Sequence, residues 1–287
     1  MGDFIGLMAA PFSACLVLVG IHTYLGLHVL EREVIFVDLA LAQVAALGAV
    51  AGTFLGLELH GAGAYAFSLA ATFIGAVLFT LTRPREGPGK SRVPHEAVIG
   101  IVYAVSASAM ILVLARAPRG AEHVQELLVG AILWVTWEEV AKTAGIYILV
   151  GVFHWIFRTR FLLVSRNPEA ARAQGVSVTL WDFLFYASFG FVVTSSVGMA
   201  GVLLVFCILI IPAAAAAYVA ESISLRLAIG WAFGTVGSMG GVALSYAFDL
   251  PTGAAVVCTL GVLLPIFKIL AKLKTAGFHS KEARIGH

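Results

Sequence analysis

Residues 201–220 read GVLLVFCILIIPAAAAAYVA, twenty consecutive residues that contain no Asp, Glu, Lys or Arg. A helix of about 20 mostly apolar residues has the length that crosses the roughly 30 Å hydrocarbon core of a bilayer. This stretch therefore predicts a membrane-spanning helix. Whether the chain as a whole belongs in lipid depends on how much more apolar sequence surrounds it.

The composition of the whole chain shows that much of its apolar surface faces lipid. Of the 287 residues, 60% are hydrophobic and 12% are charged, whereas soluble domains carry roughly 45–50% and about 25%. A larger core cannot hide this surplus, because single cores stop growing at around 250–300 residues. We therefore predict an all-α integral membrane protein, embedded in membrane lipid.

Apolar stretches of similar length recur on both sides of residues 201–220. They predict a polytopic bundle of about eight or nine transmembrane helices, at residues 7–30, 34–57, 62–82, 96–116, 137–157, 180–199, 201–220, 227–248 and 252–271. Only Gly198-Met199-Ala200-Gly201 separates the sixth from the seventh. Residues 124–135 are apolar but too short to cross, which favours a re-entrant or interfacial helix.

The basic residues predict how the bundle is oriented. Fifteen of the 18 Lys and Arg residues lie in five stretches, at 31–33, 83–94, 158–177, 221–226 and 268–287. Cytoplasmic loops carry an excess of Lys and Arg, so we assign these stretches to the cytoplasm. The N-terminus is then outside and the C-terminus is cytoplasmic. We expect one transmembrane domain over residues 1–275, followed by a cytoplasmic tail at residues 276–287.

Several functional classes lack the sequence features that they require. His95-Glu96 is not followed by the second His of an H-E-x-x-H metalloenzyme motif, and no G-x-S-x-G motif occurs. Residues 87–91, Gly-Pro-Gly-Lys-Ser, resemble the end of a phosphate-binding loop, but position 84 is Pro and no strand precedes it. We therefore predict neither an enzyme nor a nucleotide site in this chain.

The remaining composition excludes further partners and covalent frameworks. The net charge of +2 leaves no basic face large enough to follow the phosphates of a nucleic acid. Cys15, Cys207 and Cys258 lie in apolar stretches without a C-x-x-C spacing, so they are expected to act as small hydrophobic residues. We expect no nucleic-acid partner, no disulfide framework and no cofactor bound by this chain.

Polar residues within the apolar stretches are candidates for a translocation path, because burying them in hydrocarbon is costly. The candidates are His22, Asp38, Gln43 and Glu96. Each also has a structural interpretation: Glu96 near a helix N-terminus can complement the helix dipole. Asp38 and Gln43 are five residues apart, which turns about 140° of helix, so their side chains do not share a face.

One cytoplasmic stretch carries a complete set of helix start and stop signals. In residues 165–175, Asn167 can cap a helix, Pro168 suits its first position, Glu169 its first turn and Gly175 its end. We predict a two-turn, Ala-rich helix in the cytoplasm, a feature more typical of a docking helix for a partner protein than of a linker.

Four blocks of the sequence resemble the permease subunits of metal-ion ABC transporters of the zinc/manganese/iron type. They are residues 128–136 (LVGAILWVT), the 165–175 helix, residues 202–214 with Pro212, and residues 248–255 (FDLPTGAA) with Asp249, Pro251 and Gly253. The resemblance covers roughly residues 10–270. It implies a helical ABC importer permease that forms a homodimer in the bacterial cytoplasmic (inner) membrane.

The resemblance also implies partners and a role for the 165–175 helix. In this family a short cytoplasmic helix couples the permease to an ABC ATPase, and an extracytoplasmic metal-binding protein delivers a divalent metal such as zinc or manganese. The residues that match this coupling helix are Arg166, Asn167, Pro168, Glu169, Ala170, Ala173 and Gly175. ATP hydrolysis would then belong to the partner subunit, in agreement with the missing phosphate-binding loop.

The sequence departs from the family at the residues that usually present the metal. Typical members carry Asp and, four residues later, His on the second helix. Here Gln43 stands at the His position, Leu39 at the Asp position, and Asp38 one residue earlier. A metal chelate or another substrate is therefore an alternative to a free metal ion, and an ATP-independent secondary carrier is a second alternative.

Overall fold

The computed structural model describes residues 2–58, 61–83, 93–115, 130 and 132–285. Every regular element within those ranges is helical. The elements are α1 (Gly2–Glu31), α2 (Val37–Thr53), α3 (Ala62–Thr82), α4 (His95–Leu114), the 3₁₀ turn η1 (Ile132–Trp134), α6 (Trp137–Ile156), α7 (Arg158–Arg166), α8 (Pro168–Ala173), α9 (Val178–Ala217), α10 (Ile223–Phe248) and α11 (Thr252–Ile285).

The long helices match the predicted spans closely. Each of the nine predicted spans overlaps a helix or, in α9, one half of a helix. Seven helices in the described part of the chain are long and apolar enough to cross a membrane. Among the predicted spans, residues 34–57 are the exception, because the helix found there, α2, is too short. Its 17 residues make a helix of about 26 Å, slightly shorter than the hydrocarbon core.

The 40-residue α9 consists of two arms that meet at Gly201. Gly201 has φ 75° and ψ 158°, which are not helical angles, and glycine adopts such angles without the steric cost of a Cβ. Asp182, near the start of the first arm, pairs with Arg32, and Arg226, which follows the second arm, pairs with Glu31. Glu31 and Arg32 are neighbours in the chain, so the outer ends of the two arms lie close together. The chain therefore reverses direction at Gly201, where the sequence predicts the break.

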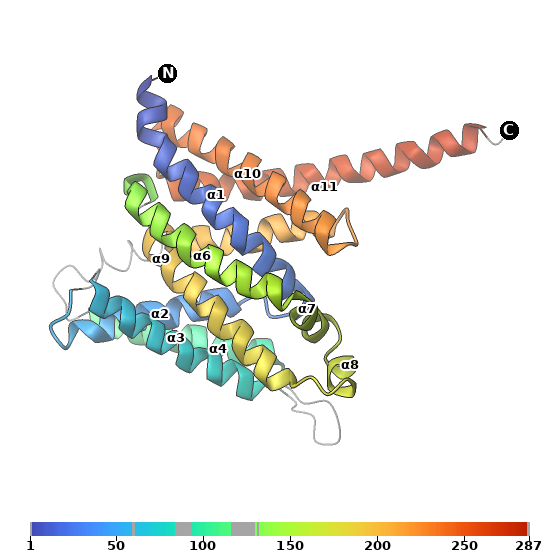
Figure 1. The fold of residues 1–287 in the computed structure, drawn as a ribbon. Coiled ribbons are helices and arrows are strands. Elements are labelled where there is room, and N and C mark those ends of the chain that lie inside the picture. The colour runs from blue at the N-terminus through green and yellow to red at the C-terminus, as the bar shows by residue number, and fades with distance from the viewer. Residues whose placement is uncertain (1, 59–60, 84–92, 116–129, 131, 286–287) are drawn as a thin grey trace.

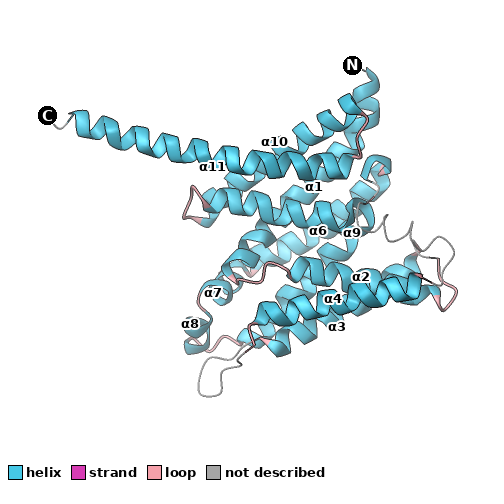
Figure 2. Ribbon diagram, turned by 180° about the vertical axis from the view of Figure 1, so that it is seen from behind, coloured by secondary structure: helices cyan, strands magenta, loops and turns pink. Residues whose placement is uncertain are grey.

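The two arms of α9 form the centre of the bundle. On one side α2, α3 and α4 pack together, and α2 and α3 contact α9. On the other side α1, α10 and α11 contact α9 and, through α10, one another (Figures 1 and 2). The C-terminal part of α11 projects away from the bundle, and residues 276–285, expected as a separate tail, continue this helix.

Close helix packing depends on small residues at a few positions. A Cβ on Gly241 of α10 would lie 2.4 Å from Cα of Val256 of α11, and a Cβ on Gly26 of α1 would lie 2.1 Å from the carbonyl oxygen of Leu209. Both contacts are too short for a real Cβ. Glycine therefore lets these backbones approach, as expected for helices that associate in lipid.

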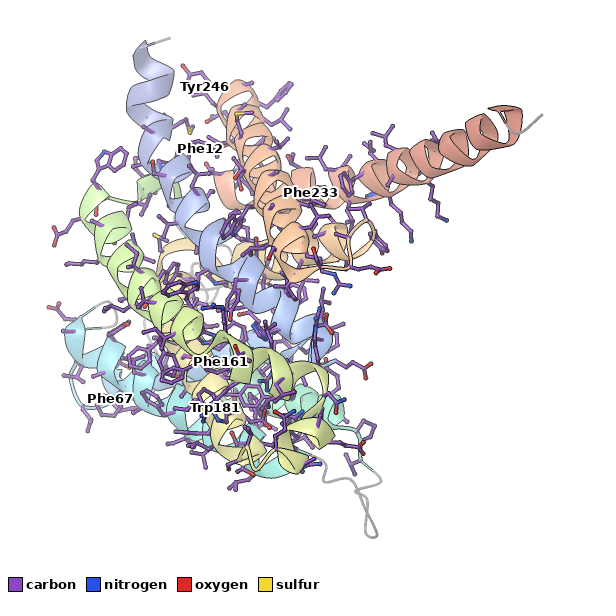
Figure 3. The ribbon with its side chains drawn as sticks, turned by 45° about the vertical axis from the view of Figure 1, so that its right-hand side comes forward. Phe12, Phe67, Phe161, Trp181, Phe233 and Tyr246 are labelled. Carbon is purple, nitrogen blue, oxygen red and sulfur yellow. The ribbon has the colours of Figure 1, made fainter. Side chains whose placement is uncertain are left out.

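Aromatic side chains fill the core at one end of the bundle. Figure 3 places Phe161 of α7 beside Trp181 of α9, and their ring centroids are 5.0 Å apart. Phe161 also stacks on His154 of α6, with a centroid distance of 4.1 Å. These contacts fix the short helix α7, and with it the following helix α8, against the membrane helices.

Candidate functional site

A buried carboxyl lies at the start of α2. Asp38 is fully buried, and among the described residues neither of its oxygens has a hydrogen-bond partner. Gln43 is also buried, and its Oε1 has no partner within the same ranges. Leaving such groups unpaired costs free energy, and more so for a carboxyl group. The two residues are therefore the groups within α2 that would gain most from a ligand.

His22 is held in a network of hydrogen bonds. Its Nδ1 donates to the Leu18 carbonyl oxygen at 2.9 Å, and its Nε2 lies 3.1 Å from the Ser196 hydroxyl. The Tyr147 hydroxyl donates to Ser196 Oγ at 2.8 Å. Both ring nitrogens of His22 therefore already have partners, which is the arrangement of a structural histidine rather than of a free metal ligand.

The structure arranges the helices that carry Asp38 and His22 around α9. His22 of α1 and Tyr147 of α6 share Ser196 of α9 as a hydrogen-bond partner, and α2, which carries Asp38, packs against α9. Side chains of α1, α6 and α9 thus form one polar interior, and α2 contacts one of these helices. No three side chains of the His, Cys, Asp and Glu types gather closely enough in the described ranges to hold a metal ion.

Glu96 has a different surrounding from the other path candidates. Its Oε1 accepts a hydrogen bond from the backbone N–H of Phe36 at 2.9 Å. Phe36 is the residue that precedes α2, so Glu96 joins the start of α4 to the start of α2. This contact stabilises a helix N-terminus, and it lies two residues before Asp38.

The predicted docking helix has the cap that its sequence indicates. Asn167 Oδ1 accepts a hydrogen bond from the Ala170 N–H at 2.8 Å, Pro168 opens α8, and Gly175 follows its end at φ +74°. Arg166, which ends α7, bonds Glu31 of α1 at 3.3 Å. The chain is therefore anchored to α1 two residues before α8 begins.

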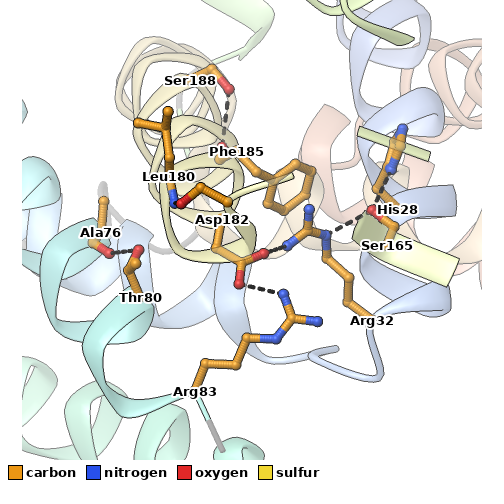
Figure 4. A network of polar contacts seen from close by, with 11 residues as sticks. His28, Arg32, Ala76, Thr80, Arg83, Ser165, Leu180, Asp182, Phe185 and Ser188 are labelled. Atoms are coloured by element: carbon orange, nitrogen blue, oxygen red, sulfur yellow. Dashed lines mark hydrogen bonds and ion pairs between the residues drawn. The ribbon is translucent and has the colours of Figure 1, made fainter. Parts of the chain in front are cut away.

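A buried ionic cluster connects this region to three membrane helices (Figure 4). Asp182 of α9 receives a hydrogen bond of 2.5 Å from Arg32 and a second bond from Arg83, which follows α3. Arg32 also donates from Nε to Ser165 Oγ at 2.9 Å, and Ser165 Oγ lies 2.9 Å from His28 Nδ1. We call Arg32, Arg83, Ser165 and Asp182 the ionic cluster.

The sequence analysis did not identify the ionic cluster. Asp182 is an acid in an otherwise apolar predicted span. The cost of burying a charge in hydrocarbon, which made Asp38 a candidate, therefore applies equally to Asp182. Its partners Arg32 and Arg83 lie 150 and 99 residues away in the chain. Only the folded chain shows that they meet.

Described residues from all five basic stretches lie at one end of the bundle, which we call the basic end. The ionic cluster brings together Arg32, Arg83 and Ser165 from three of them. Arg226 Nη1 donates to Glu31 at 2.7 Å and adds the fourth stretch. Lys268 lies 4.5 Å from the ring centroid of Tyr218, just after α9, and adds the fifth.

Two of the blocks that carry the resemblance shape a turn and a helix contact. Asp249 caps the end of α10 in the left-handed conformation, and Leu250 N–H donates to the Ser245 carbonyl at 3.0 Å. Pro251 precedes α11, and the buried Gly253 lies in its first turn. A Cβ on Gly230 of α10 would lie 3.2 Å from the Pro212 carbonyl oxygen of α9. These residues shape the bundle.

Two predicted features, the loop at residues 87–91 and most of the short apolar segment at residues 124–135, lie outside the described ranges.

The fold and its polar interior define a multi-pass helical membrane protein of the transporter type. The model of the ABC 3 transport family matches residues 5–271, and the chain belongs to this family. It is therefore a permease subunit of an ABC transporter in the bacterial cytoplasmic membrane, and it is not an enzyme.

Two relatives and one solved structure illustrate the similarity. The manganese transport system membrane protein MntC of Listeria innocua serovar 6a is 29% identical over 214 residues, covering 73% of this chain and 76% of that protein. The manganese import system permease protein ScaB of Streptococcus gordonii is 27% identical over 202 residues, covering 69% and 72%. A chain of PsaBC from Streptococcus pneumoniae in complex with Fab has a TM-score of 0.76 at 22% identity, covering 95% and 99%.

Proposed function

We propose that this permease imports a divalent metal ion, and that this ion is manganese. Membership of the ABC 3 transport family supports an ATP-driven permease rather than a secondary carrier. The relatives MntC and ScaB are named for manganese transport. Zinc, the other metal predicted from the sequence, prefers imidazole and thiolate ligands, whereas manganese suits carboxylate and carbonyl oxygens.

The observation that carries the proposal is the unpartnered, fully buried carboxyl of Asp38. A divalent cation passing this residue would supply the missing partner, whereas Gln43 Oε1 lies on another face of α2 and is not proposed to bind the same ion. His22 supports the surrounding wall through Ser196 and is not proposed as a ligand. A small number of ligands suits transport, because an ion must leave its site as readily as it enters.

We further propose that a separate cytoplasmic ABC ATPase drives the permease by docking against α8. An extracytoplasmic metal-binding protein would deliver the ion, and two copies of the chain would form the permease. The basic end is then cytoplasmic and the N-terminus outside, as the excess of Lys and Arg favours. ATP-driven movement of α8 would shift the bundle between inward-open and outward-open states, which the ligand biases.

Uptake of radioactive manganese tests the role of Asp38. The complete transporter is expressed in bacteria that lack their own manganese importers, with wild-type permease or Asp38→Asn. The variant keeps the side-chain shape and removes the charge, and we expect uptake to fall about tenfold or more, the effect of losing roughly 1.4 kcal/mol of interaction. Glu138→Gln is the control, because Glu138 is exposed and pairs only with Lys142 on its own helix.

Each alternative has its own outcome in the same assay. Equal uptake by the wild type and Asp38→Asn would remove Asp38 from the path. Uptake of zinc that manganese does not inhibit would show zinc to be the substrate. Uptake that requires a metal chelate, with no transport of the free ion, would show that the permease recognises the chelator.

A further inference from the structure

An apolar groove opens between α1, α6 and α10. Its volume is about 690 Å³. α1 contacts both other helices and lies between them (Figure 1). The floor includes Leu16 and Gly20 of α1, and the walls include Ile148 and Trp155 of α6 and Trp231 of α10. None of the residues proposed above for the metal path lines this groove.

The groove has the length of one leaflet of a bilayer. On α1 its lining runs from Leu16 to Tyr24 and on α6 from Ala144 to Trp155, which correspond to about 12 and 17 Å of helix. Half of the hydrocarbon core is about 15 Å. The lining also includes Ser224, which lies two residues before Arg226 of the basic end. The groove therefore runs from the basic end to about the middle of the membrane.

A cationic side chain and a tryptophan mark the end of the groove at the membrane surface. Arg158 donates to the Trp155 carbonyl oxygen at 3.1 Å, and its guanidinium lies 5.3 Å from the Trp155 ring centroid. No carboxylate pairs with Arg158 in the described part of the chain. Trp155 is 66% exposed, whereas Trp231 lies deeper, where its indole N–H donates to the Gly20 carbonyl oxygen at 2.9 Å. Tryptophan prefers the headgroup level of a membrane, where a basic side chain meets lipid phosphate.

Charge complementarity favours a phospholipid over a helix from a second copy. An apolar groove with a cation at its surface end matches a molecule that joins an acyl chain to a phosphate. We propose that the groove holds an acyl chain of an anionic phospholipid from the cytoplasmic leaflet, and that Arg158 binds the phosphate of its headgroup. The proposal uses the membrane orientation inferred above and is independent of the transported substrate.

Two pairs of matched variants test the site. Gly151→Leu fills the groove, because a Cβ on Gly151 meets only Ile21 Cδ1, at 3.9 Å. Its control is Gly145→Leu on the same helix, which does not line the groove and whose Cβ meets nothing within 4 Å. Arg158→Gln removes the charge, and its control is Arg160→Gln, two residues away and outside the groove lining.

Native mass spectrometry of the detergent-purified permease measures bound phospholipid. Titration with phosphatidylglycerol or phosphatidylcholine of the same chain length measures selectivity. We expect the wild type and both controls to retain phosphatidylglycerol. Gly151→Leu should lose the bound lipid, and Arg158→Gln should lose about fivefold in preference for phosphatidylglycerol.

Three results would overturn the proposal. Equal lipid content of Gly151→Leu and Gly145→Leu would show that the groove is not the lipid site. A dimer that dissociates in Gly151→Leu while lipid content is unchanged would make the groove an interface between copies. Equal binding of the two lipids by the wild type would show that Arg158 does not recognise the phospholipid charge.

Discussion

Asp182 is an acid that two arginines surround at the basic end. Asp182 is 1% exposed and Arg32 is 2% exposed, while Arg83 is 19% exposed. The Arg32 guanidinium also lies 4.1 Å from the ring centroid of Phe185, so little water reaches it. Removing one partner of a buried ion pair is costly, because it leaves the other charge uncompensated. Here a single carboxylate compensates two cations.

We expect Asp182→Asn to destabilise the fold strongly. The substitution leaves both guanidinium groups without a counter-charge, which corresponds to a loss of about 3 kcal/mol or more. The free energy of unfolding in detergent measures the effect. Glu138→Gln, which breaks an exposed pair on one helix, should leave it nearly unchanged. Equal stability of the two variants would contradict a structural role for the ionic cluster.

At the scale of elements, the short helices α7 and α8 are connected to the basic end of the bundle. α7 ends at Arg166 and α8 begins at Pro168, so Asn167 alone separates the two helices. Ser165 and Arg166 contact Arg32 and Glu31 at the end of α1. A displacement of α8 would therefore reach α1 directly and α9 through Asp182. This arrangement suits the proposed docking role of α8.

We expect Asn167→Ala to weaken coupling between the ATPase and transport. The variant loses the hydrogen bond to the Ala170 N–H, a cap that contributes about 1 kcal/mol to a helix. Ser222→Ala is the matched control, because Ser222 caps α10 through the Leu225 N–H. Metal-stimulated ATP hydrolysis by the assembled transporter should fall for Asn167→Ala only. A similar fall in both variants would indicate a general loss of stability.

At the scale of the whole molecule, the basic residues gathered at one end support the proposed membrane orientation. Labelling of single cysteines in intact cells tests it. Asp249→Cys, in the turn between α10 and α11, should react with a membrane-impermeant maleimide. Ser222→Cys, next to the basic end, should react only after the membrane is permeabilised. The reverse pattern would place the basic end outside and overturn the proposed orientation.

Individual regions differ in how far the sequence predicts them. The break at Gly201 and the cap at Asn167 depend on neighbouring residues, and the structure confirms both. The environment of Asp38 was predicted only in part. Its burial follows from the apolar sequence around it, but the helices that surround it depend on how α2 packs against α3 and α9.

The sequence by itself determined that this chain is a bundle of membrane helices with its basic residues on one side. Hydrophobic length and charge distribution are properties of consecutive residues, so they can be recognised without knowing the fold. Only the tertiary structure decided that Asp182 joins Arg32 to Arg83, that His22 is already bonded, and that α1, α6 and α10 enclose a groove. Those features depend on which helix faces meet, and in lipid that choice is made by close packing and buried polar contacts between distant segments.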